Sequence, residues 1–340
     1  MLRYLTAGES HGETITGILD GFPAGVPVPL ACIAAQLERR RLAPGRGPRQ
    51  ARETDSFQIT SGMSGGLTTG APIAVAIANS PSGKQAFSSV PRPGHADLAG
   101  MLKYGTLNAA VIRERASARE TAVRVALGSF ALRLHGLLGI RFSSRVVSLG
   151  ADAAPTVKSA MAALAAARAA GDTLGGVFEL RVDGLPAGLG GCSQGTARLG
   201  SRLAAAMFAI NSIKGFEVGG GFRLAACGGI DAAREPQLSG GLDGGITNGS
   251  PLLLRCAVKP VPGLAAGADS VNLKTFKKAR VVSKTSDTTA VFAAAVIAEH
   301  AAALELAGAL LEKFGGDSLA EIKPRVLEWR KRTGKVLARL

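Results

Sequence analysis

The longest apolar segment of the chain, residues 290–311, sets the strongest limit on what it can fold into. Its length is that of a membrane span, but Glu299, His300 and Glu305 interrupt it. A helix that is apolar on all sides and carries a few ionisable groups is typical of a core or a subunit interface. A chain of 340 residues can bury such a helix in one domain or in two.

The core is expected to consist mainly of aliphatic side chains, because the chain has only 12 Phe, two Tyr and one Trp. Apolar residues at helical spacing predict helices over 29–42, 118–138, 155–170, 195–213, 288–314 and 317–332. Runs rich in Val, Ile, Leu and Phe predict strands over 14–20, 72–78, 141–148, 176–183, 215–224 and 251–258. No biased linker and no repeat divides this mixed α and β chain, so we expect one domain over residues 1–340.

The charge balance is strongly basic, with 40 Lys and Arg against 25 Asp and Glu and a net charge of +15. This excess favours an anionic partner, which is a phosphorylated metabolite, a nucleic acid or a membrane surface. The basic clusters at 38–52 and 113–125 contain no aromatic residue, whereas proteins that stack on bases usually interleave the two. A small phosphate-bearing ligand is therefore favoured, and a non-catalytic binder of nucleic acid or phosphoinositide is the alternative class.

Cysteine usage indicates a cytoplasmic protein without a metal site. There is no C-x-x-C pair and no histidine at metal-ligand spacing, so we expect all four cysteines to be reduced and in the core: Cys32, Cys192, Cys227 and Cys256. His135 and His300 lie in apolar helical runs, and we expect them in the core or on a helix face. The first residues do not follow the pattern of a signal peptide, so secretion is not expected.

Two other histidines lie in glycine-flanked loops, where functional side chains usually gather. His11 follows Ser10 in the loop 8–12, after a short first strand, and His95 lies in the loop 91–97. Glycine lets the backbone approach a ligand closely, and an imidazole can donate a proton to a departing anion or a bound cofactor. Each histidine on its own could equally be structural.

Arginines in two segments could hold an anion. Arg39 to Arg41 at the end of a predicted helix could simply complement its dipole, but Arg46 and Arg49 lie in a Gly/Pro loop and offer planar forks for phosphate or carboxylate. Segment 115–121 begins another predicted helix, where free N–H groups and Ser117 can bind an anion. Ser117 can at the same time act as an N-cap, with the glutamate three residues on as its capping-box partner.

Several common enzyme motifs are missing from the sequence: Walker A, H-E-x-x-H and G-x-S-x-G. What remains is a set of two loop histidines, several arginines, glycine loops and Asp287, which could also be a simple charge before the following helix. The chemistry that fits is the acid-assisted loss of an anionic leaving group from a polyanionic substrate.

In their order along the chain, these motifs resemble the chorismate synthase family. The matching segments span nearly the whole sequence: 7–12, 39–49, 92–97, 103–105, 115–121, 213–219, 244–249, 259–260, 286–287 and 311–317. The resemblance implies an α+β fold, a single-domain β-α-β sandwich that forms a homotetramer, for which the apolar helix 288–314 is a plausible interface. It implies a lyase of the shikimate pathway that eliminates phosphate from 5-enolpyruvylshikimate 3-phosphate to give chorismate. The cofactor would be reduced FMN, with NADPH as a possible flavin reductant.

The resemblance also implies roles for individual residues. His11 would protonate the departing phosphate, His95 would protonate the reduced flavin, and Asp287 would help the flavin take the ring hydrogen. The substrate contacts would be Ser10, Arg40, Arg46, Arg49, Arg92 and Arg119. The flavin contacts would be Arg115, Ala116, Ser117, Asn211, Ser212, Gly244, Lys259, Pro260, Val261, Pro262, Gly263 and Thr285, and NADPH would contact Arg40 and Arg46.

Two departures from the family pattern bear on activity. Val261, Pro262 and Gly263 stand where the family usually has hydroxyl-bearing residues, and Thr285 stands where it has an arginine. Lys284 is a point charge and does not reproduce a bidentate fork. The alternative within the family is therefore a chorismate-synthase-like protein with impaired activity.

Overall fold

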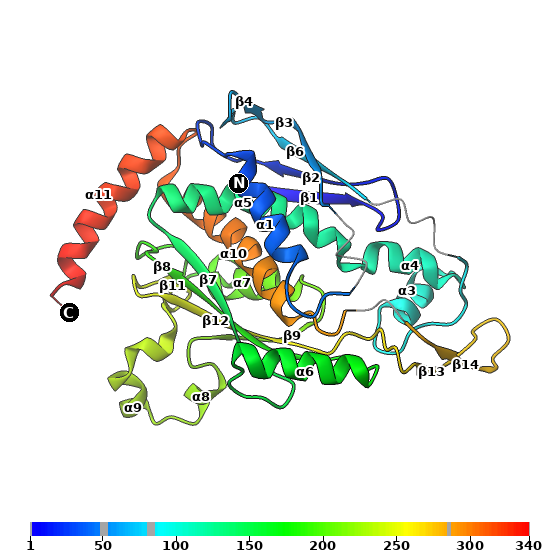
Figure 1. Cartoon of the computed structure of the whole chain (residues 1–340). Coiled ribbons are helices and arrows are strands. Elements are labelled where there is room, and N and C mark those ends of the chain that lie inside the picture. The colour runs from blue at the N-terminus through cyan, green and yellow to red at the C-terminus, as the bar shows by residue number, and fades with distance from the viewer. Residues whose placement is uncertain (1, 48–53, 80–85, 284–286, 340) are drawn as a thin grey trace.

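A computed structural model describes residues 2–47, 54–79, 86–283 and 287–339. Helices lie between two four-stranded antiparallel sheets, which makes the fold an α+β sandwich (Figure 1). The N-terminal sheet has the order β1-β2-β6-β3, with β1 at Arg3–Gly8, β2 at Thr14–Asp20, β3 at Phe57–Ser61 and β6 at Ile73–Ala78. The C-terminal sheet has the order β7-β8-β12-β9, with β7 at Arg141–Leu149, β8 at Gly176–Asp183, β9 at Ile213–Val218 and β12 at Leu252–Val258.

Four long helices fill the space between the sheets. They are α1 (Leu30–Arg41), α5 (Thr121–Leu137), α7 (Leu199–Phe208) and α10 (Val291–Phe314). Helix α5 packs against β2 and β6, and α10 packs against β7 and β8. Because α5 and α10 also pack on each other, one hydrophobic core connects the two sheets.

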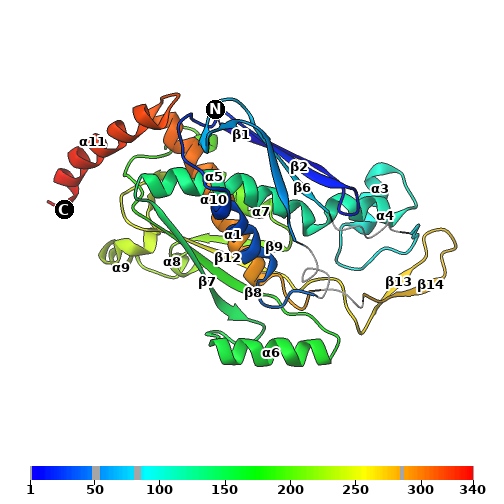
Figure 2. The ribbon, with the colours of Figure 1, turned by 45° about the horizontal axis from the view of Figure 1, so that its top comes forward.

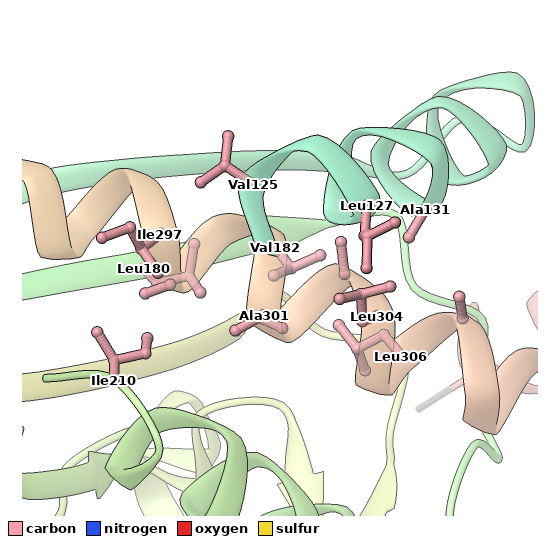
Figure 3. Packing of buried hydrophobic residues seen from close by; sticks show 14 of the residues in the cluster. Val125, Leu127, Ala131, Leu180, Val182, Ile210, Ile297, Ala301, Leu304 and Leu306 are labelled. Carbon is pink, nitrogen blue, oxygen red and sulfur yellow. The ribbon is translucent and has the colours of Figure 1, made fainter. Parts of the chain in front are cut away.

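Helix α10 is the core helix expected from the apolar segment. It is long and apolar enough to cross a membrane, but 89% of its most apolar window is buried inside the protein. Leu304 of α10 belongs to the same apolar cluster as Leu127 of α5 and Val182 of β8 (Figure 3). Since its apolar surface is already covered within one chain, the prediction that this helix forms a subunit interface is wrong.

Two other predicted helices lie outside the sandwich. Helix α6 (Val157–Ala169) flanks the C-terminal sheet, and α11 (Leu319–Leu337) extends away from the body (Figures 1 and 2). The remaining elements are short: α3 (Asp97–Tyr104), α4 (Ala109–Ala116), α8 (Phe222–Ala225), α9 (Gly229–Arg234), the 3₁₀ turns η1 (Ala118–Glu120), η2 (Gly195–Ala197) and η3 (Pro236–Ser239), and the hairpins β4–β5 (Met63–Ser64, Leu67–Thr68), β10–β11 (Leu242–Asp243, Ile246–Thr247) and β13–β14 (Ala268–Val271, Lys278–Val281).

The predicted elements are confirmed except at several ends. Strand β9 stops at Val218 rather than continuing to 224, because Gly219 and Gly221 adopt φ angles of 58° and 48° that turn the chain into α8. The helix predicted over 195–213 is shorter, since α7 ends at Phe208. The helix predicted from 118 begins as the 3₁₀ turn η1 before α5 starts at Thr121.

The cysteine and histidine predictions had different outcomes. His135 and His300 are fully buried, as expected. All four cysteines are free, and Cys256 is buried, but the expected burial is wrong for Cys32 and Cys192, which are exposed, and Cys227 is only partly covered. Cys32 shows the reason, because it lies on α1 beside buried Ile33, and adjacent helical residues point in different directions.

Candidate functional site

A cavity of about 730 Å³ lies beside the N-terminal half of α10. It brings together many residues predicted for the site: His11, Arg46, Arg92, His95, Ala116, Ser117, Asn211, Ser212, Lys259, Val261, Pro262, Gly263 and Asp287. These residues come from loops spread over most of the chain. The volume is in the range of sites that enclose a cofactor or a drug-sized ligand.

His11 follows strand β1 and is held by a carboxylate from α4. Its Nδ1 lies 3.0 Å from Glu114 Oε1, and its backbone N–H donates to Glu114 Oε2 at 2.8 Å. Ser10 is buried beneath it, and Ser10 Oγ lies 3.0 Å from Glu114 Oε2 and 2.9 Å from His11 Nδ1. Ser10 therefore supports the histidine rather than lining the cavity.

His95 is held by a second carboxylate, that of Asp97 at the start of α3. His95 Nδ1 lies 2.5 Å from Asp97 Oδ1, and Arg113 Nε donates to Asp97 Oδ2 at 2.8 Å. Arg92 Nη2 lies 3.1 Å from both ring nitrogens of His95, which places the guanidinium against the imidazole. Burial by itself would raise the pKa of Asp97, but hydrogen bonds from His95 and Arg92 hold that pKa well below its usual range.

Arg40 and Arg119 lie behind the cavity wall and share one buried carboxylate, Asp55. Arg40 Nη1 lies 3.2 Å from Asp55 Oδ2, and Arg119 Nη1 donates to Asp55 Oδ1. Arg40 Nε also donates to Thr121 Oγ1 at 3.0 Å, and Arg119 Nε donates to Asn79 Oδ1 at 2.8 Å. Since Thr121 lines the cavity, these arginines support its wall from inside the protein.

Asp287 faces a loop rather than the helix that follows it. Its carboxylate accepts hydrogen bonds from Arg46 Nη1 at 2.5 Å and from Gly47 N at 2.8 Å. The first residue of α10 is Val291, so the alternative role of Asp287 as a charge on the first helical turn does not describe its contacts. Two predicted site residues are therefore partners of each other.

The remaining walls combine apolar and polar groups. Ala293, Ala294 and Ile297 of α10 form an apolar side of the cavity. Other walls carry positive charge, for example from Lys259, whose Nζ donates to the carbonyl of Gly94. Burial, reinforced by the positive charge of Lys214, lowers the pKa of Lys259. The cavity therefore offers an apolar surface for a planar ring and positive charge for an anionic group on that ring.

Ser117 combines the two roles predicted for it. It lines the cavity, and its Oγ accepts from Arg119 N at 3.2 Å, so it caps η1. Glu120 does not act as the expected capping-box partner in these contacts, because its carboxylate accepts from Thr6 Oγ1 and pairs with Arg124. Asn211 Nδ2 donates to Ala116 O at 3.1 Å and joins the two loops.

Some predicted site residues are not in the cavity lining. Arg115 donates to Gly8 O at 3.2 Å, and Pro260 lies between two lining residues. Gly244 lies near the N-terminal end of α7, where Leu199 N donates to the carbonyl of the adjacent Gly245, whereas Asn211 follows the other end of this helix. Arg49 and Thr285, together with Lys284, lie outside the described residues.

The carboxylates that organise the site were not predicted. Glu114 lies between two arginines in a segment that was interpreted as a basic cluster, and Asp55 lies in no motif. Asp97 is the last residue of the matching segment 92–97, but no role was predicted for it. Within the described ranges 2–47, 54–79, 86–283 and 287–339, no group of three or more His, Cys, Asp or Glu could hold a metal ion.

Comparisons with known proteins agree on one family. A sequence model of the family described as "Chorismate synthase" matches residues 2–311. Curated relatives named chorismate synthase include those of Mycobacterium marinum, 43% identical over 96% of this chain and 95% of the relative, and Desulforamulus reducens, 42% identical over 97% and 98%. A solved structure titled "Crystal Structure of Chorismate Synthase" has a TM-score of 0.78 and 33% identity, and covers 97% of this chain and 98% of its own.

Proposed function

The chain belongs to the chorismate synthase family, and we propose that the cavity lined by His11 and His95 is its active site. It is a carbon–oxygen lyase that converts 5-enolpyruvylshikimate 3-phosphate to chorismate with reduced FMN. The observation that carries the proposal is that two loop histidines, each held by its own carboxylate, line one cavity together with several cations.

The cavity has the two kinds of surface that a flavin requires, one apolar and one polar. An apolar side from Ala293, Ala294 and Ile297 can cover a planar ring, and the polar side can hold its substituents and phosphate. The residues that would contact it are Ala116, Ser117, Asn211, Ser212, Lys259, Val261, Pro262 and Gly263. When bound, reduced FMN supplies an electron to the eliminating system and takes it back, so the reaction has no net redox change.

The substrate is a polyanion, and the cavity offers cations for it. Arg46, Arg92 and Arg113 line the same space, and each can form a bidentate contact with phosphate or carboxylate. We assign substrate contacts to Arg46 and Arg92, with Arg49 as a further candidate. Arg40 and Arg119, which are bonded to Asp55, are assigned to holding the wall and the local positive charge.

The two histidines have separate proton-transfer roles in this proposal. His11, over Ser10, donates a proton to the departing phosphate, which needs charge neutralisation as its bond to carbon breaks. His95 holds a proton near the flavin, and the Asp97 carboxylate fixes the orientation of its ring through Nδ1. Asp287 is a carboxylate on the cavity wall and assists removal of the ring hydrogen.

We further propose that the chain is one domain, acts on its small-molecule substrate without nucleic acid or membrane, and works as a homotetramer in the cytoplasm. The four free cysteines support a reducing compartment. Leu5 and Ile18 pair across β1 and β2 and are 71% and 43% exposed, so the outer face of the N-terminal sheet has apolar surface that another subunit could cover. Sedimentation velocity tests the tetramer.

An anaerobic assay tests the activity directly. The protein is incubated with chemically reduced FMN and 5-enolpyruvylshikimate 3-phosphate, and chorismate formation is followed by absorbance. We expect turnover, and omission of FMN should abolish it. If no chorismate forms above background, the chain is an impaired relative, and the enzyme proposal is overturned. Replacing chemical reduction by NADPH shows whether the chain reduces its own flavin.

A further inference from the structure

Glu114 is the acidic residue most closely engaged with His11. It lies in the last turn of α4, and its side chain and that of His11 are each only 12% exposed. The Glu114 carboxylate faces three groups of the loop: Ser10 Oγ, the backbone N–H of His11 and His11 Nδ1. The Glu114 carbonyl also accepts from Ser10 N at 3.2 Å, so this one residue binds the loop at four points.

We propose that Glu114 is a positioning residue that determines which ring nitrogen of His11 transfers the proton. With Nδ1 directed at the carboxylate, Nε2 is the nitrogen that exchanges a proton with the departing phosphate. This inference rests on the role of His11 in the proposed function and adds a group that acts through it.

The hydrogen-bond chemistry supports this assignment. An ionised carboxylate only accepts, so a neutral His11 must carry its proton on Nδ1 to bond Glu114. Ser10 Oγ donates to the same carboxylate at 3.0 Å, which leaves its oxygen to accept from Nδ1 at 2.9 Å. Both contacts require the same tautomer. When Nε2 also carries a proton, the imidazolium is paired with the negative charge of Glu114.

The neighbours of Glu114 show that the end of α4 serves both histidine loops. Arg113 donates to Asp97, the carboxylate that holds His95, and Arg115 donates to Gly8 O beside the His11 loop. Three consecutive residues thus reach the two loops, and only Glu114 carries the charge that complements an imidazolium. A substitution that removes this charge but keeps the shape isolates its contribution.

The test compares Glu114→Gln with Glu13→Gln, which removes an exposed carboxylate two residues after His11. Glutamine retains the size and an accepting oxygen, so the loop can keep its fold. We expect kcat to fall at least about tenfold in the Glu114 variant with little change in KM, by analogy with other groups that orient a catalytic imidazole. Glu13→Gln should match the unsubstituted enzyme.

A second readout needs neither cofactor nor turnover. Histidine-selective ¹⁵N NMR of the ligand-free protein reports the tautomer of His11, which can be assigned by His11→Ala among the four histidines. We expect the Nδ1–H form in the unsubstituted protein and a shift towards Nε2–H in Glu114→Gln. If the protein makes chorismate but the tautomer of His11 is the same in Glu114→Gln, the inference is overturned, even if the variant is less stable. If the unsubstituted protein makes no chorismate, the proposed function fails, and the NMR result still decides the tautomer.

Discussion

Acidification from pH 7 to pH 5 should destabilise this protein, because two histidines are fully buried in its core. His135 Nε2 donates to Ala303 O at 3.0 Å, and His300 Nδ1 donates to Val296 O at 2.7 Å. The other nitrogen of each ring is buried without a partner in the described part of the chain. Burial lowers the pKa of each histidine from 6.5 to about 4, because a second N–H and a positive charge could not be solvated there.

The direction and size of this change in stability follow from the pKa values of the two histidines. In the unfolded chain each histidine takes up a proton as the pH falls through about 6.5, whereas the folded chain resists until about pH 4. The contribution of these two histidines to stability is therefore complete above this window, is lost as the pH falls within it, and changes no further below it. Between pH 7 and pH 5 the loss is about 2 kcal/mol for each histidine, or about 4 kcal/mol for His135 and His300 together.

Urea unfolding at pH 7 and pH 5 measures this loss, and the double variant His135→Gln/His300→Gln is the control. Glutamine does not titrate and can donate to the same carbonyl groups, so the variant should lose about 4 kcal/mol less than the unsubstituted protein on acidification. Because the loss between pH 7 and pH 5 is compared in the two proteins, a destabilisation by the substitutions that is the same at both pH values cancels. The lowered pKa values of Asp97 and Glu179 make their contributions disappear only at lower pH. Equal losses in the two proteins would refute the argument.

Three further substitutions test separate parts of the structure. His95→Ala should reduce turnover at least about a hundredfold while the melting temperature stays within about 2 °C, and an unchanged rate would remove its proton-transfer role. Asp55→Asn should lower the unfolding free energy by about 3–5 kcal/mol in urea titrations, because two buried arginines lose their shared carboxylate; a change below about 1 kcal/mol would show that water reaches them. Gly128→Ala should lower it by at least about 3 kcal/mol, since the new Cβ would lie 2.4 Å from His300 Cβ and separate α5 from α10; an unchanged melting curve would contradict that packing.

The elements that sequence patterns predict well are those with long, regular apolar periods. Strands β2 and β8 occupy the predicted ranges 14–20 and 176–183, because apolar and polar residues alternate along each of them, as in half-buried strands. The strand predicted over 215–224 ends early, at Val218, because the run of three glycines that follows it turns the chain. Short helices such as α3 and α4 were missed, since eight residues give too few periods to recognise.

The candidate site was predictable to the level of loops and not to the level of partners. His11, His95 and Asp287 could be named because their loops carry ordered motifs, and all three line the same cavity. Their partners lie far away in sequence: Glu114 is 103 residues from His11, and Arg46 is 241 residues from Asp287. A local sequence pattern cannot reveal contacts between residues so far apart along the chain. Gly244 marks the opposite difficulty, because its motif matched the family while the fold places it away from the cavity of its own chain.

The basic composition correctly pointed to an anionic ligand, but it did not show where positive charge is available. Asp55 already neutralises much of the charge of Arg40 and Arg119, and Asp97 does the same for Arg92 and Arg113. The positive charge available to a ligand in the site is the charge of these cations minus that of the carboxylates paired with them. A net charge of +15 for the whole chain does not reveal this local balance. Carboxylates within a cluster of arginines are therefore the residues to examine first in such a chain. They determine which cations are structural, and at His11 and His95 they hold the imidazoles to which we assign proton transfer.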